Sequence, residues 1–356
     1  MKILFFTASV NIGGIERVFL SYATGLISYG HSVYFISCRD DGAMGLSIPE
    51  NIKLYSLGNI RLRYSVWRLR SIIKNIKPEV IITGNDSTLV AYLAKILCFY
   101  KNVKLVTSQH SYYNNNETLF YTKPILKYIF PRCSKVIAVS TGIADMLSTE
   151  FGMTSPHVRV INNPVDINKI DTDALDTIES SILPSKFFVF LGRMTSVKNL
   201  EFLIDSFEAF CKMNIDYSLV MIGDGYERDR LERYVSIKGL NDKIIFIGSQ
   251  HNPFPYLKKS KLLLLTSFSE AYPTVLIEAM RLGVTCVCTP TLGAIDILEN
   301  GRYGYITKSF NDVNEFAQMM VYAIFNMKDP VLLSQHVERK YSLDSKVNEL
   351  LNFINS

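Results

Sequence analysis

The chain has 356 residues, of which 48% are hydrophobic and 20% are charged. A chain of this length is too long for a single hydrophobic core of ordinary size, so two α/β domains are expected. The composition is that of a folded globular protein and excludes a disordered chain. The net charge of +5 is unevenly spread. The first 165 residues hold 18 basic and 9 acidic residues, a net +9, whereas the rest holds 20 and 24, a net −4. We therefore expect the two halves to meet different partners.

The first half of the chain alternates strand and helix patterns. The predicted strands are residues 3–8, 32–37, 80–83, 103–108 and 136–139, and the predicted helices are 14–29, 63–75, 88–99, 124–130 and 142–151. Such alternation predicts a doubly wound, Rossmann-like parallel sheet with ligands at the carboxyl ends of its strands. We assign residues 1–163 to this N-terminal domain and the polar stretch 164–184 to an interdomain linker with a short helix.

The pattern then restarts. The predicted strands are 187–191, 217–222, 244–247, 262–265, 285–288 and one near 305, and the predicted helices are 200–211, 227–237, 254–258, 274–282 and 294–298. A second doubly wound domain is therefore expected over residues 185–335. The tail is helical by pattern, and the segment 336–356 is a candidate to cross back to the first domain.

The stretch Ser267 to Met280 carries two carboxylates around a predicted helix start. It follows an apolar run, 262–265, that is typical of a buried parallel strand, and Pro273 is expected at the first helical position. The first amides of such a helix suit a phosphate, while Glu270 and Glu278 suit sugar and ribose hydroxyls. The alternative, which spacing alone favours, is that one glutamate caps a turn and the other is solvated.

A basic loop follows the predicted strand 187–191. Gly192 is followed by Arg193 and, five positions later, by Lys198, just ahead of a predicted helix. Two cations at the carboxyl end of a strand are placed to neutralise a diphosphate. An ordinary basic loop between a strand and a helix is the alternative.

Two glycine-containing loops follow other predicted strands of the second domain. Gly223 and Gly225 flank Asp224, and glycine lets a backbone turn tightly beside a ligand, although a lone G-x-G is a weak signal. In the segment 289–294 a helix is expected to start at Gly293 and to offer its amides. Four loops at one sheet edge thus suit a nucleotide diphosphate joined to a sugar.

These motifs, in their order along the chain, carry a family resemblance. They are Gly13-Gly14-Ile15-Glu16-Arg17, His110, Ser140-Thr141-Gly142-Ile143-Ala144, Asn163-Pro164-Val165-Asp166, Gly192-Arg193 with Lys198, Gly223-Asp224-Gly225, and the pair Glu270 and Glu278. Across nearly its whole length the chain resembles the retaining glycosyltransferases of family four, of the bacterial surface-polysaccharide type. That family has the GT-B fold, in which two Rossmann-like domains face a cleft.

The resemblance implies residue roles. The catalytic set it implies is Arg193, Lys198, Glu270 and His110, with the two cations on the donor diphosphate, Glu270 on the transferred sugar, and His110 facing sugar and acceptor. The donor-binding set it implies is Gly13, Gly14, Gly192, Gly223, Gly225, Tyr272, Pro273, Thr274, Val275 and Glu278. The family usually has glutamate where Asp296 stands. Because of this departure, the resemblance does not assign a role in donor binding to the predicted helix 294–298.

The implied reaction moves a sugar from a nucleotide diphosphate, with UDP favoured, to a glycan or lipid-linked acceptor bound by the N-terminal domain, in cell-surface polysaccharide synthesis. The resemblance implies retention, and no residue is an obvious nucleophile for double displacement, so we favour front-face attack. Fixed cations aimed at the departing diphosphate lower the barrier. Two alternatives stay open: a UDP-sugar epimerase of the same fold, and a non-catalytic nucleotide-sugar-binding partner.

A metal is not expected. Asp171-Thr172-Asp173 spells the D-x-D with which another class of glycosyltransferases holds a divalent ion, but here it lies in an acidic linker with no apolar strand before it. A solvated helix start explains it better. The histidines form no ligand cluster either, so we predict metal-independent activity without a cofactor.

The basic N-terminal half suggests a membrane partner. Six cations fall in one acid-free stretch beside Trp67, namely Arg61, Arg63, Arg68, Arg70, Lys74 and Lys77, and residues 120–130 mix aromatics with lysines. A basic amphipathic helix suits an anionic membrane surface. Nucleic acid is a poorer explanation of the charge, because no nucleic-acid recognition motif accompanies it in the sequence. The alternative is a core helix with a charged outer face.

The expected location is cytoplasmic, with peripheral contact at the inner face of the membrane. The six cysteines lie scattered, without metal spacing or a disulfide framework, as in a reducing compartment. The first apolar run is too short for a signal peptide, and no window approaches the ~18 apolar residues of a membrane span.

Overall fold

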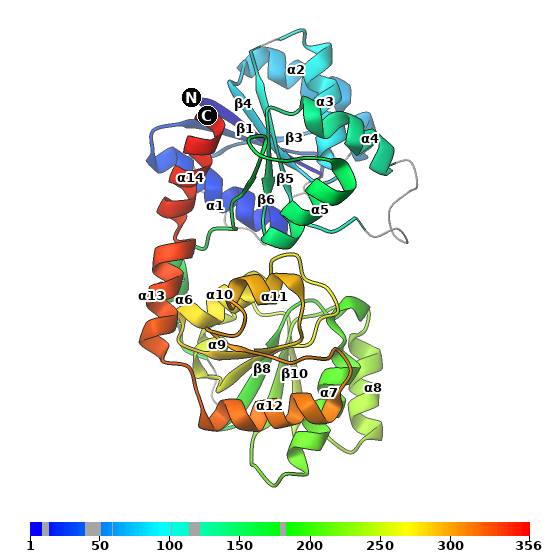
Figure 1. Cartoon of the computed structure of the whole chain (residues 1–356), viewed down its shortest axis with the longest axis vertical. Coiled ribbons are helices and arrows are strands. Elements are labelled where there is room, and N and C mark those ends of the chain that lie inside the picture. The colour runs from blue at the N-terminus through cyan, green and yellow to red at the C-terminus, as the bar shows by residue number, and fades with distance from the viewer. Residues whose placement is uncertain (9–13, 40–50, 59, 101, 114–121, 179–182) are drawn as a thin grey trace. The chain divides into compact units, whose positions relative to one another are not determined.

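The computed structural model (Figure 1) describes residues 1–8, 14–39, 51–58, 60–100, 102–113, 122–178 and 183–356. Its contacts divide the chain into two compact units. The first comprises Met1–Val165 together with Leu343–Ser356, and the second comprises Asp166–Ser342.

The first unit contains a parallel sheet whose described strands run in the order β3-β2-β1-β4-β5-β6-β7. These strands are β1 (Lys2–Thr7), β2 (Ser32–Ser37), β3 (Lys53–Ser56), β4 (Val80–Gly84), β5 (Lys104–Gln109), β6 (Lys135–Ala138) and β7 (Val158–Val160). The helices are α1 (Gly14–Ser28), α2 (Val66–Ile76), α3 (Ser87–Leu97), α4 (Thr122–Ile129), α5 (Thr141–Phe151) and α14 (Leu343–Asn355), with 3-10 turns at η2 (Leu62–Tyr64) and η3 (Phe130–Arg132).

The second unit repeats this plan with the strand order β10-β9-β8-β11-β12-β13. Its strands are β8 (Phe187–Leu191), β9 (Ser218–Ile222), β10 (Ile244–Gly248), β11 (Leu262–Leu265), β12 (Thr285–Cys288) and β13 (Tyr305–Ile306). Its helices are α6 (Ile167–Asp173), α7 (Leu200–Cys211), α8 (Arg228–Ile237), α9 (Phe254–Lys259), α10 (Thr274–Arg281), α11 (Leu292–Ile297), α12 (Val313–Phe325) and α13 (Pro330–Tyr341), with a 3-10 turn at η4 (Ser196–Lys198).

Both sheets are doubly wound around a central pair of strands. In the first unit β1 pairs with β2 through Ile3 and Val33, and with β4 through Ile3 and Val80, so the strand order reverses between β1 and β4. In the second unit it reverses between β8 and β11. Such a reversal leaves a crevice outside the carboxyl ends of the two central strands, which is where ligands bind in open α/β sheets. The predicted α/β fold of two Rossmann-like domains is confirmed.

Apolar residues explain why these segments fold as they do. The central strands β8 and β11 are runs of large apolar residues with almost no exposed surface, as expected for strands covered by helices on both faces. Phe188 and Phe190 pack with Phe207 of α7 in one core cluster of the second unit. A separate cluster in the first unit contains Phe5 and Phe35.

Two strands were missed from the sequence. All four residues of β3 are exposed, and β7 has only three residues with no buried one among them. Both lie at the edges of the first sheet. An edge strand with a solvated surface lacks the apolar run that predicts a strand, and this explains the omission.

The connections between the units differ from the predicted boundaries. The stretch 164–184 was expected to be a linker, but α6 belongs to the second unit, and Arg281 of α10 binds Asp171 there through Nε to Oδ1 at 2.8 Å. The predicted C-terminal segment 336–356 also divides. Its first part completes α13, where Ser334 accepts a hydrogen bond from Arg281 at 2.9 Å, so this helix stays in the second unit.

The last helix, α14, packs on the first unit beside α1 (Figure 1). Val347, Leu350 and Phe353 of α14 are buried in the same core cluster as α1 residues. Gly25 of α1 makes room for this contact, because a Cβ there would lie 2.6 Å from Val347. The chain therefore returns to its first unit only at Leu343.

Candidate active site

Two loops of the second unit meet outside the carboxyl ends of β8 and β11. The backbone N–H of Phe268, after β11, donates to the carbonyl of Val197 at 2.9 Å, and the Thr266 hydroxyl donates to the carbonyl of Lys198, also at 2.9 Å. These bonds join the basic loop to the loop that carries Glu270. Because β8 and β11 are the central strands of the sheet, the joined loops lie at the position where such folds bind ligands.

A charged pair lies at this junction. Lys198 Nζ is 2.5 Å from Glu270 Oε1, and the Ser267 hydroxyl donates to the same oxygen at 2.7 Å. The two charged side chains are only 21% and 15% exposed, so the attraction between them is less screened than on an open surface. The pair holds one cation and one carboxylate in fixed positions side by side.

Arg193 is the second cation of this edge. It follows β8 directly, and its side chain is exposed. Within the described residues no ion-pair partner is found for its guanidinium. Its full charge and its fork of N–H donors are thus available to an anionic ligand, which a guanidinium binds through two parallel hydrogen bonds.

The Gly223 to Gly225 loop packs its backbone against the basic loop. Met194 N–H donates to the carbonyl of Asp224 at 2.8 Å. Gly223 has φ +133°, and a Cβ there would overlap the carbonyl oxygen of Gly192; a Cβ at Gly225 would overlap that of Met194. Glycine is therefore required at both positions by close backbone approach as well as by conformation.

The start of α11 also contacts the loop that carries Glu270. Gly293 N–H donates to the carbonyl of Glu270 at 3.1 Å, and a Cβ on Gly293 would lie 2.7 Å from that oxygen. The helix begins at Leu292, one residue earlier than predicted, with Thr291 as its N-cap. Asp296 lies half-buried in this helix.

The α10 helix carries the second glutamate. Pro273 is its N-cap rather than its first helical residue, and Thr274 and Val275 form its first turn. Glu278 lies half-buried in the next turn. Tyr272, just ahead of the helix, is buried with its ring 6.4 Å from that of Tyr341 at the end of α13. That contact was not predicted, because the two tyrosines are far apart in the sequence.

His110 follows β5 in the first unit. Its backbone N–H donates to Asn85 Oδ1 at 2.9 Å, and its Nε2 lies 2.8 Å from the Ser108 hydroxyl. Burial lowers the pKa of His110 to about 3, so the ring is neutral near pH 7. Sequence reasoning missed Asn85 and Ser108, although both stand at the ends of strands, which is the signal that could have identified them.

A cavity of about 180 Å³ lies at the reversal point of the first sheet. It is lined from the ends of β1 and β4 and from α1, by residues that include Thr7, Glu16 and Asn85. Gly14 begins α1, while Gly13 lies outside the described residues. This half of the predicted site thus combines hydrogen-bonding side chains with two carboxylates, Glu16 and Asp86, and no described cation lines it.

The D-x-D motif lies within α6 rather than at the end of a strand. Asp171 binds Arg281, and Asp173 pairs with Lys169 at 2.9 Å. Residues two apart on a helix do not face each other, so the two carboxylates do not converge. Within the described ranges no group of three or more His, Cys, Asp and Glu side chains is arranged to hold a metal ion.

The structure thus brings together Arg193, Lys198 and Glu270 with the glycine loops in one unit. It places Glu278 on the helix that starts beside them, and His110 in the other unit. The catalytic and binding roles of these residues stay predictions.

Two family models match the chain. The model described as Glycosyltransferase Family 4 matches residues 12–169, and the model described as Glycosyl transferases group 1 matches residues 173–335. Between them they span most of the sequence, with one model on each unit.

Curated relatives are similar over most of both lengths. A Campylobacter jejuni enzyme named as a GalNAc-α-(1→4)-GalNAc-α-(1→3)-diNAcBac-PP-undecaprenol α-1,4-N-acetyl-D-galactosaminyltransferase is 28% identical over 86% of this chain and 84% of its own. The lipopolysaccharide 1,6-galactosyltransferase of Salmonella typhimurium is 23% identical over 85% and 84%.

Solved structures support the fold. A glycosyltransferase from Rickettsia africae has a TM-score of 0.83 at 20% identity, covering 99% of this chain and 97% of its own. Anabaena HepE, solved in complex with UDP and glucose, has a TM-score of 0.82 at 18% identity, covering 100% and 99%. With both family models matched in order, one on each Rossmann-like unit, the chain belongs to the GT-B glycosyltransferases that pair a Family 4 domain with a group 1 domain.

Proposed function

We propose that the protein transfers a sugar from a UDP-sugar to a lipid-linked glycan acceptor, with retention and without a metal, at the cytoplasmic face of a membrane. The observation that carries this proposal is the Lys198 and Glu270 pair, fixed 2.5 Å apart outside the two central strands of the second sheet. A cation suits the diphosphate of such a donor, and an adjacent carboxylate suits the hydroxyls of its sugar.

The chemistry follows from where charge develops. Breaking the bond between sugar and phosphate builds negative charge on the departing diphosphate, and fixed cations there lower the barrier because they need no reorganisation. Lys198 is held by Glu270, while Arg193 has no ion pair among the described residues and is free to bind phosphate oxygens. Glu278, on α10 behind the loop, is assigned to the ribose hydroxyls.

The donor and acceptor classes are supported by the relatives. HepE was solved with UDP, and the Campylobacter relative is named for an undecaprenol-linked acceptor. We therefore propose UDP as the carrier and a lipid-linked glycan as the acceptor. His110, neutral and held by Asn85, is assigned to the hydroxyls of sugar or acceptor as a hydrogen-bonding group rather than as a charge.

The first test measures UDP release. With a UDP-sugar chosen by a thermal-shift screen, UDP release should depend on an added lipid-linked acceptor, and the product should keep the anomeric configuration of the donor. An epimerase would instead interconvert the UDP-sugar without an acceptor. A non-catalytic binder would release no UDP at all, and either result would reject the proposal.

Metal independence has a separate test. Because the aspartates of α6 are engaged by Arg281 and Lys169, we expect UDP release to persist in EDTA. Complete loss in EDTA with recovery on adding manganese would contradict this part of the proposal.

Membrane contact is assigned to α2. It buries Leu69, Ile73 and Ile76 and exposes Trp67, whose side chain is 64% exposed. No described helix is both long and apolar enough to cross a bilayer. A helix with cations and an exposed tryptophan is suited to lie on an anionic surface.

The structure refines the set of cations to test. Arg68 and Arg70 donate to the carbonyls of Leu57 and Leu97, so their removal would also disturb the fold. The other four cations of the stretch are exposed, namely Arg61, Arg63, Lys74 and Lys77. Changing these four to glutamine should weaken flotation with anionic vesicles, by about 1 kcal/mol for each cation near the surface. Flotation that is unchanged would remove α2 as the docking element.

A further inference from the structure

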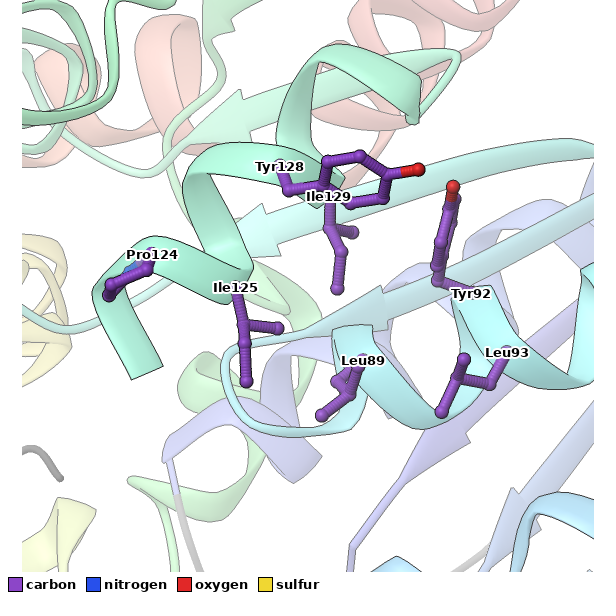
Figure 2. Close-up of a pocket in the computed structure, with 7 residues that line it drawn as sticks. All are labelled: Leu89, Tyr92, Leu93, Pro124, Ile125, Tyr128 and Ile129. Atoms are coloured by element: carbon purple, nitrogen blue, oxygen red, sulfur yellow. The ribbon is translucent and has the colours of Figure 1, made fainter. Parts of the chain in front are cut away.

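An apolar pocket of about 330 Å³ opens between α3 and α4 of the first unit (Figure 2). It lies outside the predicted site, and its α4 side falls in the stretch 120–130 that mixes aromatics with lysines. Its lining residues are Leu89, Tyr92, Leu93, Pro124, Ile125, Tyr128 and Ile129. Nearly all of the lining atoms are carbon, which excludes a polar metabolite as the natural occupant.

The two helices expose this lining because of their residue spacing. Leu89, Tyr92 and Leu93 lie on one face of α3, three and four positions apart, and that face continues to Ile96, which is exposed. Large apolar side chains at such a density are unusual on a surface and mark an interaction site. The apolar face of α3 is therefore longer than the pocket itself.

The only polar groups that the lining side chains bring to the pocket are two tyrosine hydroxyls. Figure 2 shows the hydroxyls of Tyr92 and Tyr128 pointing toward one another. The other lining residues, among them Leu89, Leu93 and Ile125, form an apolar wall. An occupant of this pocket needs no hydrogen-bonding group of its own.

Positive charge surrounds this apolar surface. Arg132 lies 3.6 Å from the ring centroid of Tyr128, and Lys127 is exposed one residue before that tyrosine. Arg70 of α2 reaches the end of α3 through its bond to Leu97. No acidic residue occurs within α2, α3 or α4. An occupant that combines hydrocarbon with negative charge fits this arrangement best.

We propose that the pocket takes one hydrocarbon chain of an anionic membrane lipid, while Arg132 and Lys127 meet its phosphate. The occupant is identified by the pairing of an uncharged, carbon-lined pocket with Arg132 and Lys127, for which the described residues supply no ion-pair partner. The inference rests on the proposed membrane docking and deepens it: α2 would contact the surface, and the pocket between α3 and α4 would anchor a single chain. A preformed pocket avoids the ordering cost that weakens binding to flexible surfaces.

Soluble alkyl phosphates test the pocket without a bilayer. Below their micellar concentrations, octyl, decyl and dodecyl phosphate should bind the full-length protein with affinities that rise about fourfold per methylene, as measured by calorimetry. Leu89→Trp fills the pocket from within and should abolish this rise. An affinity that does not change with chain length, or one that Leu89→Trp leaves unaltered, would overturn the inference.

Vesicles then test the same residues at a membrane. With phosphatidylcholine vesicles containing a quarter phosphatidylglycerol, Leu93→Gln should lower flotation roughly tenfold or more. Leu54→Gln is the matched control, because Leu54 is 38% exposed against 39% for Leu93 but lies on β3 at the sheet edge away from α3 and α4. Equal losses in the two variants, or none, would reject the pocket as an anchor.

Two further measurements distinguish lipid binding from misfolding and from self-association. Circular dichroism and thermal unfolding check that each variant is folded. UDP-induced thermal stabilisation reports the second unit separately, so a failure of the donor assignment leaves the lipid result interpretable. Light scattering detects self-association. If the wild-type chain dimerises and Leu89→Trp makes it monomeric without any change in alkyl phosphate binding, the pocket holds a second copy of the chain and the lipid proposal is wrong.

Discussion

The two units share one architecture and differ in what stands at the carboxyl ends of their strands. In the second unit the central loops hold a half-buried ion pair, Lys198 with Glu270, beside the exposed Arg193. At the strand ends of the first unit stands the neutral His110, bound by Asn85 and Ser108. The comparison teaches that the doubly wound sheet fixes where loops meet, whereas the loop side chains decide which ligand suits them.

The helices extend this contrast. In the first unit α2, α3 and α4 carry cations and no acids, and among the described residues Lys123 is their one ion-paired cation, with Glu150 at 2.7 Å. The second unit instead pairs many of its surface charges, as in Lys238 with Glu208 at 2.6 Å. Paired charges create little field beyond their neighbourhood, while an unpaired basic surface attracts an anionic one. The charge imbalance seen between the sequence halves therefore has a structural location.

The largest expected effect is a loss of turnover when the ion pair of the second unit is broken. Lys198→Gln removes the cation assigned to the leaving diphosphate, and we expect kcat to fall about 10² to 10³-fold in steady-state measurement of UDP release. Lys212→Gln is the control, since Lys212 also pairs with a glutamate, Glu208 at 2.8 Å, but on an exposed helix surface. Similar activities for the two variants would mean that the ion pair has no catalytic part.

Adding a Cβ at Gly223 should lower the free energy of unfolding. Gly223→Ala puts a Cβ onto the carbonyl oxygen of Gly192 at a φ that alanine disfavours, so we expect a loss of about 3 kcal/mol in urea unfolding. Gly239→Ala has φ +67° but open space around the new Cβ, and should cost about 1 kcal/mol. Equal losses would show that conformation alone, without the close approach of two loops, requires glycine at position 223.

Substitutions of Glu270 and Glu278 should affect different kinetic parameters. Glu278→Gln should weaken UDP affinity about tenfold in calorimetry, as expected when a charged hydrogen-bond acceptor is lost, with little change in kcat. Glu270→Gln should instead lower kcat and alter the preference among UDP-sugars. If both variants keep kcat/KM within about twofold of wild type, neither glutamate has its assigned role.

The smallest expected effect is on the pH dependence of stability and concerns His110 of the first unit. Because burial lowers the pKa of His110 to about 3, the unfolded chain binds a proton below about pH 6.5 that the folded chain does not bind. Stability should therefore fall as the pH drops through that range, by under about 1 kcal/mol at pH 6. His110→Gln should remove this part of the acid dependence in thermal unfolding from pH 8 to pH 5, and an unchanged profile would indicate that His110 binds its proton equally well in the folded and the unfolded chain.

Elements with strong apolar patterns were predictable without the structure. The strands of both sheets that are buried by helices were predicted within a few residues, and the order of strands, loops and helices predicted two doubly wound domains. It also predicted which loops carry Arg193, Lys198 and Glu270, because βα loops of a parallel sheet emerge at one edge. These features depend on local periodicity and on connection rules, which a single sequence contains.

Contacts between side chains that are far apart in the sequence depend on how the elements pack. Lys198 and Glu270 are 72 positions apart, and only the pairing of β8 with β11 brings them into contact. The same holds for α14 on α1 and for the pocket between α3 and α4, which form where faces of distant helices pack. The solvated edge strand β3 gave no apolar signal, since its partners rather than its own residues hold it in the sheet. Local pattern specifies burial, whereas the choice of neighbour is made by the assembled sheet.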